Sequence, residues 1–60
     1  MKKTIELTNS KDKEAVYVIV DKIVSFRWVE RFKSTAINMI SGPTVWVDDT
    51  PENIDALIHR

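Results

Sequence analysis

The chain has 60 residues, no cysteine, and nine basic against nine acidic side chains. This length leaves room for one domain with a small core, and the lack of cysteine excludes disulfides and thiolate metal sites. Because 43% of the residues are hydrophobic and 30% charged, the composition is typical of a folded globular protein. We therefore expect one domain over residues 1–60, whose small core is supplemented by self-association, most simply as a homodimer.

The N-terminal residues and the lengths of the apolar runs indicate where in the cell the protein is expected. Charged and alternating residues follow Met1 directly, where a signal peptide has an apolar run of about 7–15 residues. The longest apolar run, residues 15–20, has six residues, whereas a membrane-spanning helix needs about 20. The sequence thus predicts a cytoplasmic protein without a membrane partner.

The first half of the chain has the pattern of a β-hairpin. Residues 3–8 alternate apolar and polar side chains, as in a half-buried strand, and residues 15–20 are rich in β-branched and aromatic types. Residues 9–14 between them contain no apolar side chain and predict a loop. Because both faces of the second strand are apolar, we expect one to face the core and the other a helix or a partner.

A third strand is expected after a bend at residues 21–22. Residues 23–32 alternate apolar with polar side chains, which places three apolar residues on one face: Val24, Phe26 and Trp28.

Two shorter strands complete the expected sheet. A tip at residues 31–34 leads back into a fourth strand over residues 35–40. Residues 41–44 hold the only glycine and a proline, which indicates a turn. Residues 45–47 then form a short fifth strand.

A helix is expected to begin at Pro51. Thr50 can cap the first free amides, proline suits the first helical position, and the neighbouring acidic residues complement the positive end of the helix. One apolar stripe can lie on the sheet, and it consists of Ile54, Leu57 and Ile58. The sequence therefore predicts an α+β fold: a small, curled antiparallel sheet or open barrel of about five strands with one C-terminal helix.

Few side chains are suited to catalysis or to metal binding. His59, the only histidine, follows the expected helix, and a catalytic imidazole needs a positioned partner. The lone Gly42 cannot form a phosphate-binding loop. The acidic residues near the expected helix, Asp48, Asp49, Glu52 and Asp55, lack the spacing and the glycine of a calcium loop. Helix capping accounts for Asp48, Asp49 and Glu52 without a metal. We expect no catalytic residue, no metal and no cofactor.

Residues 27–33 mix arginine, lysine, tryptophan and phenylalanine. Several of these types are enriched at protein-binding hot spots, and their combination also suits single-stranded nucleic acid. In a purely structural interpretation, the aromatic side chains fill the core and the charged ones keep a strand end soluble. Trp46 carries the same ambiguity. The candidate partner-binding residues are Arg27, Trp28, Arg31, Phe32 and Lys33.

The order of motifs also resembles a known group of short proteins. These motifs are Ile5-Glu6-Leu7-Thr8, a Val-Tyr-Val strand leading to Asp21-Lys22-Ile23, a Ser41-Gly42 turn, and an ending of the type Val-x-Asp-x-Thr-Pro-Glu-x-Ile. The chain resembles the FlbD/SwrD-like flagellar proteins and similar short proteins of phages and prophages. The resemblance implies a compact β-rich fold with a terminal helix. It carries over no functional residue, because the chain lacks a glycine in the first hairpin and adds the basic-aromatic segment.

We therefore expect a non-catalytic interaction module of the kind that phages and mobile elements encode, binding a host protein or a small ligand. The alternative is a small nucleic-acid-binding protein that uses the basic-aromatic strand end. An enzyme would need a pocket assembled across protomers.

Overall fold

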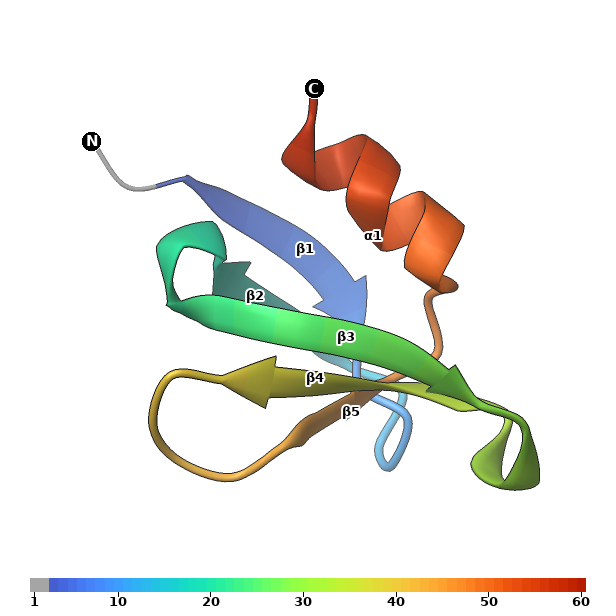
Figure 1. Cartoon of the computed structure of the whole chain (residues 1–60). Coiled ribbons are helices and arrows are strands. Elements are labelled where there is room, and N and C mark those ends of the chain that lie inside the picture. Colours follow the sequence, from blue (N-terminus) through green and yellow to red (C-terminus); the bar gives the residue numbers. More distant parts are fainter. Residues whose placement is uncertain (1–2) are drawn as a thin grey trace.

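The computed structural model describes residues 3–60, and it confirms the α+β class (Figure 1). Within these residues the strands form two antiparallel sheets and no closed barrel. The elements are β1 (Thr4–Thr8), β2 (Ala15–Ile19), β3 (Ile23–Val29), β4 (Ser34–Met39), β5 (Val45–Val47) and α1 (Pro51–Ile58). No helix among residues 3–60 combines the length and the apolar character needed to cross a membrane.

The two sheets meet where β1 and β5 end. β1 pairs with β2, and β4 lies between β3 and β5. Asn9 forms a bridge with Val47, and the Asp48 amide donates to the Thr8 carbonyl at 2.8 Å. These contacts hold the second sheet against the first, so that both can share one core.

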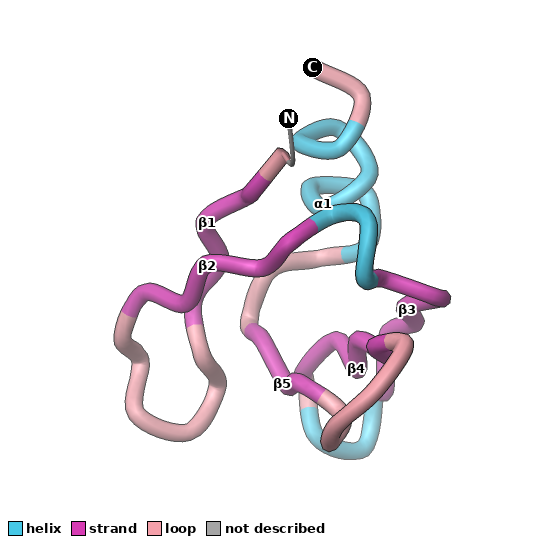
Figure 2. The backbone as a smooth tube through the Cα atoms, turned by 90° about the vertical axis from the view of Figure 1, so that its left-hand side faces the viewer, coloured by secondary structure: helices cyan, strands magenta, loops and turns pink. Residues whose placement is uncertain are grey.

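The core draws on both sheets and on the helix. Its most buried members are at most 5% exposed: Ile5, Leu7, Val18, Ile37, Val47 and Ile54. The period-two pattern of the first strand is reflected in its burial, because Glu6 between two core residues is exposed. Figures 1 and 2 show α1 beside β1 and above β3, where its apolar stripe covers the core.

The start of α1 follows the capping signal. The Thr50 side chain accepts a hydrogen bond from the Asn53 amide at 3.2 Å, and Pro51 occupies the first turn. At the other end, Lys3 Nζ donates to the Ile58 carbonyl at 2.6 Å, where a cation complements the negative end of the helix dipole.

β3 differs from the expected strand in its register. Ile23 lies opposite Met39 and Ser25 lies opposite Asn38, with a register shift between them, so Val24 is the extra residue of a β-bulge. As a result Val24 is 65% exposed, although alternation placed it on the same face as Phe26. Phe26 does pack against the core.

β3 also ends earlier than the alternation predicts. It stops at Val29, and a 3₁₀ turn (Glu30–Phe32) follows. Lys33 closes this turn with a left-handed backbone, φ 52°. The tip that joins β3 to β4 is therefore a compact turn rather than an extension of the strand.

The outer face of β2 is open in the single chain. Val18 is buried and Val16 packs against the core, whereas Tyr17 on the alternate face is 66% exposed. The expected covering of this face by the helix is wrong, because α1 lies on the core side. Its covering by a second copy stays a prediction.

Candidate functional site

A surface groove of about 670 Å³ lies between the β1–β2 loop and the β3–β4 tip. Eight of its ten lining residues are polar or charged, and the other two are aromatic. We call it the outer groove. Its lining residues are Asn9, Ser10, Lys11, Lys13, Phe32, Lys33, Ser34, Thr44, Trp46 and Asp48.

The groove lies on the face of the second sheet that is turned away from the core. Residues directly opposite each other in an antiparallel pair share a face, so Arg27, Ala36 and Trp46 form one row across β3, β4 and β5. The adjacent row contains Phe26 and Ile37, which belong to the core. By strand alternation, Arg27 and Trp46 therefore lie on the outer face.

Phe32 and Trp46 form an aromatic pair in the outer groove. Their ring centroids are 5.4 Å apart with an interplanar angle of 84°, an edge-to-face arrangement, and such pairs contribute about 0.5–1.5 kcal/mol. The Arg31 guanidinium lies over the Phe32 ring, 5.7 Å from its centroid. Phe32 is 59% exposed, and Trp46 is half-buried. An exposed ring is thus held in a defined orientation.

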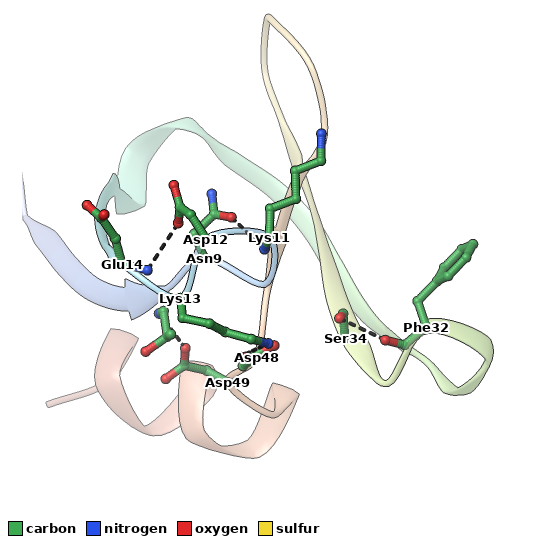
Figure 3. Close-up of polar contacts among 10 residues, drawn as sticks. Asn9, Lys11, Asp12, Lys13, Glu14, Phe32, Ser34, Asp48 and Asp49 are labelled. Atoms are coloured by element: carbon green, nitrogen blue, oxygen red, sulfur yellow. Dashed lines mark hydrogen bonds and ion pairs between the residues drawn. The ribbon is translucent and has the colours of Figure 1, made fainter.

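The backbone at the tip supports this orientation. Ser34 Oγ donates to the Phe32 carbonyl at 3.0 Å (Figure 3), and the Lys33 amide donates to the Glu30 carbonyl at 3.2 Å. Because these bonds close the turn, Phe32 does not depend on its ring contacts alone for its position.

The β1–β2 loop forms the opposite wall and is held by its own polar residues. Asn9 Oδ1 accepts from the Lys11 amide at 2.8 Å, and Asp12 Oδ1 accepts from the Glu14 amide at 3.0 Å (Figure 3). Asparagine and aspartate stabilise turns in this way. Lys13 has a left-handed backbone, φ 63°, and its amide donates to the Asn9 carbonyl at 2.9 Å.

Lysines stand on both walls of the outer groove. Lys13 Nζ lies 2.8 Å from Asp48 Oδ2, and Lys33 pairs with Glu30 across the tip. Lys11 forms no ion pair with any of residues 3–60, and Figure 3 shows its side chain extending in a different direction from that of Lys13. Because the lining includes three lysines and one aspartate, the outer groove has a net charge of +2.

Among the ionisable groups, Glu30 has the most clearly shifted pKa. Its hydrogen bond with Lys33, and to a smaller extent the one from Trp28, holds the pKa of the Glu30 carboxyl below its ordinary value. The Glu30 carboxylate thus accepts hydrogen bonds from two side chains at the tip, Trp28 and Lys33.

The structure brings most of the candidate residues together. Phe32 and Lys33 line the outer groove, Arg31 lies over Phe32, and Arg27 shares the outer row with Trp46. Trp28 departs from this group, because it lies opposite Thr35 on the other face of β3. Its indole Nε1 donates to Glu30 Oε1 at 2.9 Å.

The loop wall of the groove was not among the candidates. Lys11 and Lys13 stand in a segment whose composition predicts only a loop, and Asp48 was assigned to helix capping. The pair formed by Lys13 and Asp48 joins residues 35 positions apart in the chain, so no local pattern reveals it. Whether Trp46 faces the core or the outer groove follows only from the register of β4 and β5.

Groups suited to metal binding or proton transfer are sparse. Among residues 3–60, no cluster of three or more His, Cys, Asp or Glu side chains is placed to hold a metal ion. His59 lies one helical turn from Asp55, with Nε2 3.2 Å from Oδ1, and both side chains are exposed.

Comparison of the chain with protein-family models, curated proteins and solved structures finds no match.

Proposed function

We propose that the protein is a non-catalytic interaction module that binds a short segment of a partner protein in the outer groove. The observation that carries this proposal is the exposed Phe32 ring, which Trp46 and Arg31 hold in the groove. Aromatic side chains and arginine are enriched among the residues that dominate binding energy. A pre-oriented ring also loses little conformational entropy when a partner packs against it.

The dimensions of the outer groove suit such a segment. Its volume of about 670 Å³ falls within the range of roughly 300–1,000 Å³ for sites that enclose small ligands. A groove of this volume admits only a few side chains of a partner at once. A free small ligand would use the same rings and lysines.

Nucleic acid is the second candidate, because lysines beside aromatic rings also suit a single strand. Nucleic-acid-binding domains commonly have a pI above about 9, whereas the pI of this chain is about 6.5. Arg31 also occupies one face of the Phe32 ring, which leaves less of it for base stacking. We therefore favour a protein segment. The phage or mobile-element origin, the homodimer and the cytoplasmic location stay predictions.

The test is selection of binders from a random peptide library, followed by affinity measurement with two matched variants. Phe32→Ala removes the ring from the groove, and Tyr17→Ala removes a similarly exposed ring (66% against 59%) from β2. We expect selected peptides to bind the wild type and Tyr17→Ala equally and to bind Phe32→Ala at least about tenfold more weakly, as for a hot-spot residue. Peptides that bind all three proteins equally, or failure to select any peptide, would contradict the proposal.

A further inference from the structure

Two lysines on opposite walls of the outer groove have a backbone conformation that is unfavourable for them. Lys13 and Lys33 have φ angles of 63° and 52°. These values lie in the left-handed backbone region, which residues with a Cβ rarely adopt. Glycine or asparagine would fit either position more easily. Residues in such conformations cluster at functional sites. Here the unusual backbone carries an ammonium group to each wall.

These ammonium groups retain hydrogen-bonding capacity. Each has three donors; Lys13 uses one on Asp48 and Lys33 uses one on Glu30. The carboxylates fix the amino groups in place without using all their donors. Lys11 adds a third ammonium to the same lining.

The charge around the outer groove limits what can bind there. The lining carries a net charge of +2. Asp12 and Glu14 on the loop, and Glu30 and the cationic Arg31 on the tip, are exposed nearby. One or two carboxylates on a ligand match the lining. A longer polyanion would extend over these acidic residues and be repelled.

We infer that the outer groove binds an acidic protein segment in which an apolar side chain lies between carboxylates. The apolar side chain packs on Phe32 and Trp46, and the carboxylates bind Lys13 and Lys33 on the two walls. This inference rests on the proposed function, because it specifies the segment that the module binds.

The experiment compares two labelled peptides by fluorescence anisotropy at low salt. One peptide has a central phenylalanine flanked by glutamates, and the other has glutamines in place of the glutamates. The protein variants are Lys13→Asn and Lys33→Asn, which remove the charge but tolerate the left-handed backbone. Lys22→Asn, at an exposed lysine outside the groove, is the control.

We expect the acidic peptide to bind about tenfold more tightly than the amide peptide, with affinity falling as salt is added. Each groove variant should weaken binding of the acidic peptide about two- to fivefold, as expected for loss of one exposed ion pair. The control should bind like the wild type, and equal melting temperatures would show that the fold is kept. If either asparagine variant melts early, Lys13→Gly or Lys33→Gly replaces it.

Other outcomes would overturn the inference. If library-selected peptides depend on Phe32 but the two labelled peptides bind equally, the acidic segment is wrong and the interaction module stands. If no peptide depends on Phe32, both fail. Tighter binding of a labelled single-stranded oligonucleotide than of the acidic peptide would replace the protein segment with nucleic acid.

Discussion

Asp49 forms hydrogen bonds with three separate parts of the chain, namely β1, β4 and α1. Its Oδ1 accepts from the Thr8 amide at 2.8 Å, and its Oδ2 accepts from Asn53 Nδ2 at 3.0 Å. Its carbonyl accepts from Thr35 Oγ1 at 2.5 Å. The expected role of Asp49 near the helix start is thus only part of what it does, because it also ties β1 and β4 to that start.

Replacing Asp49 by alanine should therefore destabilise the fold. The Thr8 amide is part-buried, and leaving such a donor without an acceptor costs about 1–3 kcal/mol. Chemical denaturation of Asp49→Ala and of Asp55→Ala measures the difference. Among residues 3–60 the Asp55 side chain has only an exposed contact with His59, so its loss should change the free energy of unfolding by less than about 0.5 kcal/mol. Equal effects would contradict the bridging role.

Glu30 gives the tip a dependence on pH. Lys33, and then Trp28, lower the pKa of the Glu30 carboxyl from 4.5. A carboxyl with a lowered folded-state pKa stabilises the fold fully above its ordinary pKa, and this contribution is lost as the pH falls through the lowered value. The Trp28 indole N–H resonance should therefore shift with a midpoint below pH 4.5, as measured by NMR. Glu30→Gln should remove this step, and a midpoint above the ordinary value would contradict the assignment.

At the scale of elements, α1 depends on its cap. The helix has eight residues, which is shorter than an isolated helix needs for stability in water. Thr50→Ala removes the side-chain acceptor for the Asn53 amide and should lower the free energy of unfolding by about 1 kcal/mol. Thr50→Ser keeps the hydroxyl and should retain most of that stability. If the serine and alanine variants are equally unstable, the cap is not the cause.

Local sequence patterns predict the elements well, but not their irregularities. Alternation in β1 and the Thr50-Pro51 signal depend on neighbouring residues, and both correspond to what is observed. The bulge at Val24 depends on pairing with β4, which no local pattern contains. Alternation does place Arg27 and Trp28, adjacent in sequence, on opposite faces, but only the pairing with β4 and β5 shows that Arg27 lies on the side of the outer groove.

The open edge of β3 is protected by these same irregularities. Within residues 3–60, β3 has a strand neighbour only on the β4 side, and a free edge can template unwanted pairing. The bulge at Val24 and the 3₁₀ turns that flank β3 (Val20–Lys22 and Glu30–Phe32) interrupt the regular row of donors and acceptors. We expect these features to oppose aggregation through this edge.

At the scale of the whole molecule, Ile54 links the helix to both sheets. It is fully buried and belongs to the same core as Leu7 and Ile37. Ile54→Ala should cost about 2–5 kcal/mol, a large share of the roughly 5–15 kcal/mol available to a domain. Ile40→Ala is the matched control, because Ile40 is 65% exposed.

Thermal unfolding followed by circular dichroism and by tryptophan fluorescence tests this link. Both signals of Ile54→Ala should fall together at a lower temperature, and Ile40→Ala should melt like the wild type. Separate transitions would mean that the helix is dispensable to the sheets.

The pairing of Lys3 with the last turn of α1 places the two ends of the described chain side by side. Lys3 Nζ donates to the carbonyls of Ile58 and Arg60, at 2.6 and 3.3 Å. In Figure 1 this end of the molecule lies opposite the β1–β2 loop and the β3–β4 tip. A fluorescent protein fused to either terminus, or a tag that attaches the protein to a sensor chip, would therefore leave the outer groove directed into solution.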